Sequence, residues 1–157
     1  MTDETAIALV ERLAYLKAAT VAADYPEALV LGSDQSLMVN GQLLGKPGSV
    51  AAAERQLQFL SGREVVFETA VRLVCKQRKL SLQRRIPTTV IFRTLNKAEI
   101  RRYIQLEMPL DCAGSFKSEA LGISLLAGLD STDPSALIGL PLIATAELLR
   151  LAGCQIP

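Results

Sequence analysis

The most informative absence in this sequence of 157 residues is histidine, which does not occur at all. Histidine is the usual general base of hydrolases and a common metal ligand, so Ser-His-Asp and Cys-His arrangements and histidine metal sites are excluded. If the chain is an enzyme, its proton chemistry has to use Asp, Glu, Lys, Tyr or Cys. A carboxylate that works with a hard, oxygen-binding cation is the natural remaining arrangement.

Cysteine is scarce as well, with only Cys75, Cys112 and Cys154 in the chain. Their number is odd and no two of them have CxxC spacing, so neither a zinc site nor a disulfide framework is predicted. We interpret them as small buried apolar residues of a protein in the reducing cytoplasm. The opening residues 1–4 agree with this location, because a signal peptide would begin with basic residues and turn apolar.

The sequence also lacks an excess of charge and a long apolar run. Its 17 basic and 16 acidic residues leave a net charge of +1, whereas proteins that bind extended nucleic acids usually carry a strongly basic face. We therefore expect no extended nucleic acid as a partner, although a single nucleotide remains open. No stretch reaches the roughly 18 apolar residues of a membrane span. Half of the residues are hydrophobic, which predicts a single domain over residues 1–157.

The first half of the chain alternates between helical and extended patterns. Apolar residues at helical spacing predict a helix over residues 3–23, and a β-rich run predicts a buried strand over residues 28–33. Asn40-Gly41 predicts a hairpin between residues 36–39 and 42–44. Ser49 is expected to cap a helix that ends at residue 60.

The second half continues this alternation. Residues 64–76 and 81–92 are expected to pair as strands, and Asn96 with Glu99 predicts a capped helix to about residue 107. Further elements are expected at residues 122–129 (a strand), after Asp133 (a short helical turn capped by this aspartate) and at residues 141–151 (a helix). Alternating helices and strands with hairpins among them predict an α/β fold with a mixed sheet.

Two polar residues stand out near the predicted first strand. Asp34 follows the apolar run, so we expect it at the carboxyl end of that strand, where ligand sites of open α/β sheets gather. The hairpin would return Gly45-Lys46-Pro47 toward the same end, where Lys46 can neutralise phosphate beside a metal-binding carboxylate. Taken alone, a turn aspartate and a solvated lysine are the simpler interpretations.

A loop of small residues further along brings a second lysine and carboxylate together. Lys117 and Glu119 lie in the segment 113–122, whose small residues let backbone N–H groups approach a ligand closely. Without other information this segment is an ordinary loop, and Lys17 on the first predicted helix is a surface lysine.

Together these segments closely resemble the Maf family of nucleotide pyrophosphatases, and in particular its branch that hydrolyses 7-methyl-GTP. The resemblance runs from about residue 4 to residue 153, and the matching residues are 13–18, 32–35, 45–47, 60–62, 92–95, 109–119 and 137–143. It implies the Maf-like fold, which is inosine triphosphate pyrophosphatase-like, with a mixed β-sheet flanked by helices. It also implies a nucleoside triphosphate diphosphatase that releases pyrophosphate with a divalent cation, Mg²⁺ or Mn²⁺.

The resemblance assigns roles to individual residues. The aspartate that Asp34 matches is the family's catalytic base, and metal ligation by Asp34 remains an alternative. Phosphate contacts are implied for Lys17 and Lys46, and we expect Lys117 of the small-residue loop to bind phosphate as well. The positions of Gln35 and Glu119 distinguish the 7-methyl-GTP branch from the branch that acts on dTTP and UTP. A carboxylate at position 119 suits guanine, which offers two N–H donors, and N7-methylation makes that ring cationic.

One part of the family pattern is not found in this sequence. Family members begin with an apolar strand and a Ser/Thr-rich loop that ends in arginine and wraps the phosphates, and an acidic residue follows. This sequence starts almost directly at the next helix, so we expect it to lack that strand and loop. A second hypothesis is therefore a non-catalytic nucleotide-binding or interaction protein with the same fold. A homodimer remains open.

Overall fold

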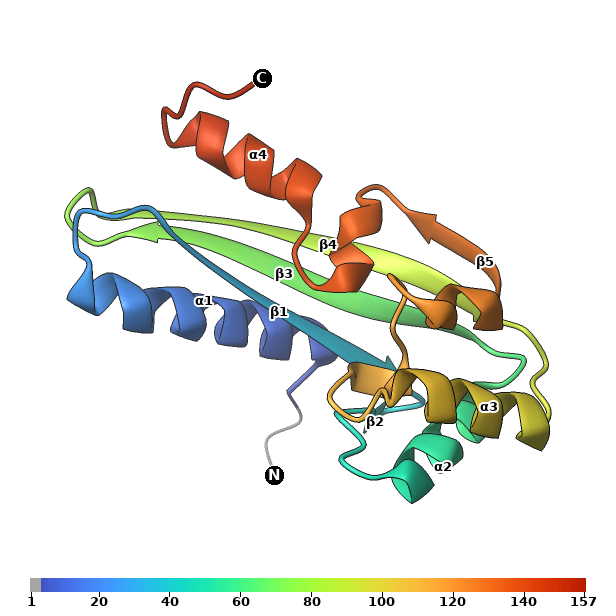
Figure 1. The fold of residues 1–157 in the computed structure, drawn as a ribbon. Helices are drawn as coiled ribbons and strands as arrows, with labels where there is room; N and C mark the ends of the chain where they lie inside the picture. Colours follow the sequence, from blue (N-terminus) through green and yellow to red (C-terminus); the bar gives the residue numbers. More distant parts are fainter. Residues whose placement is uncertain (1–3) are drawn as a thin grey trace. The chain divides into compact units, whose positions relative to one another are not determined.

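The computed structural model describes residues 4–157 as helices around one five-stranded sheet. The elements are α1 (Ala6–Asp24), β1 (Val30–Val39), β2 (Gln42–Leu43), α2 (Val50–Leu60), β3 (Glu64–Cys75), β4 (Leu80–Phe92), α3 (Lys97–Glu107), the 3₁₀ helices η1 (Ala113–Ser115) and η2 (Leu121–Leu125), β5 (Leu126–Ser131), η3 (Pro134–Ile138) and α4 (Leu142–Leu151). The strand order is β2-β1-β3-β4-β5 (Figure 1). The predicted α/β class and the helix-flanked sheet are confirmed. The strands run antiparallel rather than mixed, because hairpins join β1 to β2 and β3 to β4.

The chain divides into two compact units. The first unit contains the chain up to Gln35 together with Glu68–Pro87 and Ser131–Pro157, and the second contains Ser36–Phe67 and Thr88–Asp130. Strands β1, β3 and β4 each contribute residues to both units. The single domain expected over residues 1–157 stays a prediction.

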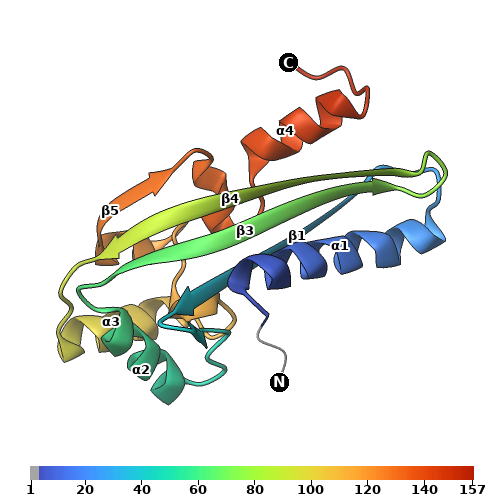
Figure 2. The ribbon, with the colours of Figure 1, turned by 180° about the vertical axis from the view of Figure 1, so that it is seen from behind.

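In the first unit, β3 is buried on both faces. Ala70 packs with Val10 and Ala14 of α1, whereas the next residue, Val71, packs with Leu148 of α4. Successive residues of a strand point to opposite faces of the sheet. Helices α1 and α4 therefore cover opposite faces of this part of the sheet, as Figures 1 and 2 show.

Helix α1 comes into close contact with β1 at Gly32. A Cβ atom on Gly32 would lie 2.3 Å from the carbonyl oxygen of Ala14 and 2.6 Å from the backbone nitrogen of Ala18. Both alanines are fully buried, so the smallest side chains of the helix meet the glycine of the strand. This close approach fixes the part of α1 that carries Lys17.

The core of the second unit is built around aromatic side chains. The ring of Phe116 lies 6.1 Å from that of Phe67 and 5.4 Å from that of Phe92, centroid to centroid. Such tilted and edge-on pairs are favourable arrangements of aromatic rings. Phe116 directly precedes Lys117, so burial of this ring anchors the predicted ligand loop to the core.

Predictions that rest on short-range signals are confirmed. The Asn40-Gly41 turn joins β1 to β2 with Met38 opposite Leu43, and Ser49 caps α2 by accepting a hydrogen bond from the backbone nitrogen of Ala52. Helix α3 begins with the full capping box of Asn96 and Glu99. The first helix is present from Ala6, after the cap Thr5, and Asp3 lies outside the described residues.

Two predicted strands had the wrong limits. Strand β1 continues to Val39, so Asp34 lies inside the strand and not at its carboxyl end. Strand β1 extends this far because its last residues pair with β2: Met38 lies opposite Leu43, and Val39 lies opposite Gln42. Strand β5 starts at Leu126 rather than at residue 122, because Gly122 lies in η2, where a Cβ atom would be only 2.2 Å from the carbonyl oxygen of Lys117.

Asp133 is the N-cap residue of η3 and Pro134 its first residue, as predicted, but the Asp133 side chain makes no capping hydrogen bond to η3. This buried carboxylate accepts hydrogen bonds from the backbone nitrogen of Ala144 (3.0 Å) and from the hydroxyl of Ser135 (2.5 Å). Ser135 in turn accepts a bond from the backbone nitrogen of Leu142 (2.7 Å). Pro141 stands at the cap position of α4 and has no side-chain acceptor, so Asp133 and Ser135 take over that task.

We expect Gly32→Ala to destabilise the fold by about 2–3 kcal/mol, because the new methyl group would collide with helix backbone that cannot move independently. Urea unfolding followed by circular dichroism measures this change. Gly45→Ala is the matched control, since a Cβ atom at Gly45 would meet nothing within 4 Å. Equal midpoints for the two variants would show that α1 is not held by this contact.

Candidate functional site

The first unit brings Lys17 and Asp34 into direct contact. The ammonium group of Lys17 donates to Oδ1 of Asp34 at 2.5 Å and to the carbonyl oxygen of Ser33 at 2.9 Å. The Asp34 side chain is only 16% exposed, whereas that of Lys17 is 56% exposed. A largely buried carboxylate thus has one partner that reaches it from the solvent side.

The residues on either side of Asp34 are engaged elsewhere in the same unit. The hydroxyl of Ser33 lies 2.8 Å from the carbonyl oxygen of Ala70 and 2.7 Å from that of Gly139. The side-chain nitrogen of Gln35 donates to the carbonyl oxygen of Ala136 at 2.9 Å. Because side chains alternate along a strand, these two residues share the face opposite to that of Asp34.

The second unit brings Lys46 and Lys117 to one acidic residue. Nζ of Lys117 lies 3.8 Å from Oδ1 of Asp111. The hydrogen bond from the Cys112 thiol lowers the pKa of the Asp111 carboxyl, and the positive charges of Lys117 and Lys46 lower it further. The backbone nitrogen of Gly48 also donates to Leu110, which ties the turn after Lys46 to this segment. Lys117 therefore lies beside Asp111, and the positive charge of Lys46 also acts on this carboxyl group.

Tyr103 of α3 holds the loop that carries Lys117. Its hydroxyl oxygen accepts a hydrogen bond from the backbone nitrogen of Lys117 at 3.0 Å, and burial raises the pKa of Tyr103 to about 12. Glu107, at the end of α3, accepts from the backbone nitrogen of Leu121 at 3.3 Å. The loop is thus fixed to α3 on both sides of Glu119, whose side chain is exposed.

Cys112 does not have the character of a nucleophile. Burial and a hydrogen bond to Asp111 raise the pKa of the Cys112 thiol to about 11. The thiolate is the reactive form of cysteine, so this thiol is protonated and inert near neutral pH. Of the three cysteines predicted to be buried, only Cys75 is buried, whereas Cys112 and Cys154 are partly exposed.

The predicted residues therefore form two sets, one in each unit. Lys17, Asp34 and Gln35 belong to the first unit, and the side chain of Gln35 points away from the ion pair of the other two. In the second unit are Lys46, Lys117 and Glu119. Sequence reasoning missed the supporting residues Tyr103 and Thr69, because each acts on a group that is distant in the sequence and unmarked by a local pattern.

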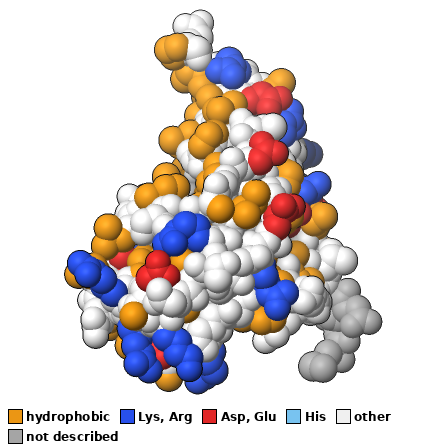
Figure 3. Space-filling model, turned by 90° about the vertical axis from the view of Figure 1, so that its right-hand side faces the viewer, with side chains coloured by type: hydrophobic (Ala, Val, Ile, Leu, Met, Phe, Trp, Pro, Cys, Tyr) orange, Lys and Arg blue, Asp and Glu red, His pale blue; other side chains and the backbone are white. Residues whose placement is uncertain are grey.

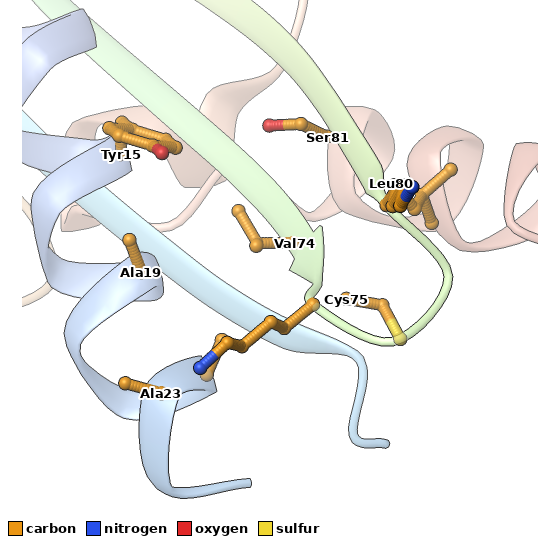
Figure 4. Close-up of a pocket in the computed structure, with 10 residues that line it drawn as sticks. Tyr15, Ala19, Ala23, Val74, Cys75, Leu80 and Ser81 are labelled. Carbon is orange, nitrogen blue, oxygen red and sulfur yellow. The ribbon is translucent and has the colours of Figure 1, made fainter. Parts of the chain in front are cut away.

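A separate apolar pocket of about 350 Å³ lies within the first unit. Tyr15, Ala19 and Ala23 of α1 line one side of it, and Val74 and Leu80 come from the hairpin of β3 and β4 (Figure 4). It contains none of the predicted site residues. On the face that Figure 3 shows, basic, acidic and apolar side chains are interspersed, in keeping with the small net charge of the sequence.

Comparison with known proteins identifies the family. Residues 1–152 match the family model described as "Maf-like protein". The chain belongs to the Maf family. This confirms the resemblance carried by the GSDQ segment and the Lys117 loop.

Several relatives of this Maf chain bear the name 7-methyl-GTP pyrophosphatase. One from Aromatoleum aromaticum is 53% identical over 146 residues, which are 93% of this chain and 75% of the relative. Another, from Xanthomonas axonopodis pv. citri, is 54% identical over 98% of this chain and 80% of its own length. A third, from Albidiferax ferrireducens, is 47% identical over 98% of this chain and 77% of its own length.

Residues 4–157 lack two structural features. No helix in this range combines the length and the apolarity needed to cross a lipid bilayer. The same residues contain no group of three or more His, Cys, Asp or Glu side chains arranged to hold a metal ion.

We expect Tyr103→Phe to lower the affinity for nucleotide about tenfold without unfolding the protein, because the Lys117 backbone loses its acceptor and the loop loosens. Isothermal titration with 7-methyl-GTP measures the affinity. Tyr25→Phe is the control, since Tyr25 is 63% exposed. Equal affinities for both variants and the parent would show that this bond does not order the loop.

Proposed function

We propose that this Maf protein hydrolyses 7-methyl-GTP to 7-methyl-GMP and pyrophosphate. The observation that carries the proposal is its identity of 47% to 54%, over at least 93% of its length, with relatives named for this activity. The ion pair of Lys17 and Asp34 supports the proposal, because it joins a carboxylate that can accept a proton from water to an ammonium group that can contact a phosphate.

Hydrolysis of a triphosphate depends mostly on positioning the reactants and neutralising oxygen charge. In this mechanism, Asp34 accepts a proton from the water that attacks the α-phosphorus, and the bond to the pyrophosphate oxygen breaks. Lys17 holds the carboxylate in place and offers its one remaining N–H bond to a phosphate oxygen. Lys46 and Lys117 contribute further positive charge to the phosphates.

A divalent cation fits the chemistry of Asp34. Magnesium is usually held by one or two carboxylates, with substrate phosphates and water as its other ligands. The cation, when bound, would neutralise charge that develops on the phosphate oxygens. Mg²⁺ and Mn²⁺ are both suitable.

Glu119 is the residue that we propose to read the base. Its side chain is exposed, so the carboxylate is available to a ligand. The loop that carries it is fixed through the hydrogen bond between Tyr103 and the Lys117 backbone. An ionised carboxylate makes charge-assisted hydrogen bonds with the two N–H donors of guanine. The carbonyl groups of a pyrimidine would instead repel it. A cytoplasmic location and a homodimer complete the proposal.

We expect Asp34→Asn to lower pyrophosphate release from 7-methyl-GTP by at least about a hundredfold, because the amide cannot accept the proton of water. Nucleotide binding, measured by titration calorimetry, should change little. Asp24→Asn, at the exposed end of α1, is the matched control and should keep the parent rate. Near-normal turnover of Asp34→Asn would remove Asp34 from the mechanism.

Pyrophosphate release should be measured for the chain of 157 residues and for a version that also carries a Maf-type N-terminal strand and loop. Release by the extended version alone would show that this segment is required for turnover. Binding without release in both versions would contradict the proposed activity and favour a non-catalytic nucleotide-binding protein.

We expect Glu119→Gln to reduce the preference for 7-methyl-GTP over dTTP about tenfold, because a neutral amide loses the charge-assisted contact with guanine. The ratio of kcat/KM for the two substrates measures this preference. Glu64→Gln is a suitable control, since Glu64 is an exposed residue of the same unit. An unchanged ratio for Glu119→Gln would assign the reading of the base to another residue.

A further inference from the structure

Two side chains of β1 hold one backbone segment of the first unit. Ser33 and Gln35 flank Asp34, and both bind carbonyl oxygens of residues 136–139. The hydroxyl of Ser33 donates to Gly139 at 2.7 Å, and the amide of Gln35 donates to Ala136 at 2.9 Å. The segment is therefore fixed to the strand at two points, on the face opposite to that of Asp34.

The amide nitrogen of Gln35 is fully used by these contacts. It has two hydrogens, and three acceptors surround it, namely the carbonyl oxygens of Ala136 and Leu137 (3.1 Å) and the hydroxyl of Thr69 (3.1 Å). No N–H bond of this amide is left for a nucleotide base. A direct reading of the base by the Gln35 amide would require it to give up these bonds.

Thr69 completes the arrangement from β3. Its hydroxyl accepts from Gln35 and donates to the carbonyl oxygen of Ala136 at 3.0 Å. Thr69 is 0% exposed, so no substrate can touch it. An effect of Thr69 on the choice of nucleotide could arise only through the groups that it binds.

The fixed segment presents an apolar side chain to the solvent. Ile138 is 60% exposed. The carbonyl oxygen of the next residue, Gly139, accepts a hydrogen bond from the hydroxyl of Ser33, which precedes Asp34. The carbonyl oxygen of Ser33 also accepts from Lys17, so the residue that holds Gly139 contacts the lysine of the ion pair as well. The position of Ile138 depends on the bonds from Ser33, Gln35 and Thr69.

We propose that Thr69 is a positioning residue for nucleotide selection, and that Gln35 acts together with it by fixing residues 136–139 rather than by donating to the base. The proposal rests on the proposed pyrophosphatase function. It accounts for specificity at position 35 without a free donor on Gln35.

The first test compares two buried threonines. Thr69→Val should lower the preference for 7-methyl-GTP over dTTP, measured as the ratio of kcat/KM values, by about three- to tenfold. Loss of folded protein cancels in this ratio, so a merely structural role would not move it. The control is Thr145→Val, because the Thr145 hydroxyl is buried in the same unit and has no hydrogen-bond partner among the described residues.

A double-mutant cycle tests whether Gln35 and Thr69 act as a unit. If both act through the segment, Gln35→Leu should shift the ratio in the same direction as Thr69→Val. The double variant should then show less than the product of the two single shifts. A shift with Gln35→Leu together with an unchanged ratio for Thr69→Val would overturn the proposal, because it would show direct reading by Gln35.

Hydrogen exchange tests the arrangement independently of catalysis. In a peptide covering residues 132–141, exchange should become at least about threefold faster in Gln35→Leu and Thr69→Val and stay unchanged in Thr145→Val. Unchanged exchange in both of the first two variants would overturn the positioning role even if the protein is active. Faster exchange in a protein without pyrophosphatase activity would support the positioning of the segment while rejecting the proposed function.

Discussion

The contact between α1 and Gly32 is the constraint on which the predicted chemistry of the first unit depends. Only a residue without a side chain lets the helix backbone come within 2.3 Å of the position of a Cβ atom. That approach puts Lys17 against Asp34, and a helix pushed outward by one methyl group would separate them. The close packing of the α1 backbone on Gly32 thus determines whether the ion pair of Lys17 and Asp34 can form.

The four residues of the GSDQ segment have different physical tasks. Gly32 admits the helix, and Asp34 meets the lysine of that helix. Ser33 and Gln35 point the other way and hold the segment before α4. The alternation of a β-strand explains how consecutive residues can serve a reactive group on one face and its support on the other.

In the second unit, the loop that carries Lys117 and Glu119 is held in place by hydrogen bonds to α3. Phe116 is buried in the aromatic core, and the next residue, Lys117, is held by its backbone to Tyr103. Ordering of this loop before a ligand arrives reduces the entropy that binding has to overcome. The lysine and glutamate side chains can therefore be exposed while their positions remain restricted.

Much of the fold could be predicted because its signals are local. The Asn40-Gly41 turn, the Ser49 cap and the capping box at Asn96 each depend on residues within four positions of one another. The missed features depend on tertiary contacts. Asp133 accepts a hydrogen bond from the first turn of α4, at Ala144, eleven residues later in the sequence. No capping pattern in the sequence indicates this contact.

The site shows the same division. Asp34, Lys46 and Glu119 were identified from motifs, and their assigned roles come from the family rather than from the fold. Thr69 and Tyr103 had no such signal, because a threonine in a strand and a tyrosine in a helix are ordinary residues there. What makes them important is a partner, Gln35 for one and the Lys117 backbone for the other.

The capping of α4 by Asp133 has a consequence for how this part of the chain folds. The first turn of α4 lacks a cap of its own, so it gains its hydrogen bonds only when residues 133–135 are in place. The short segment and the helix must then form and open together as one cooperative unit. Burial of Leu148 against β3 therefore also stabilises residues 133–135, which are distant from Leu148 in the sequence.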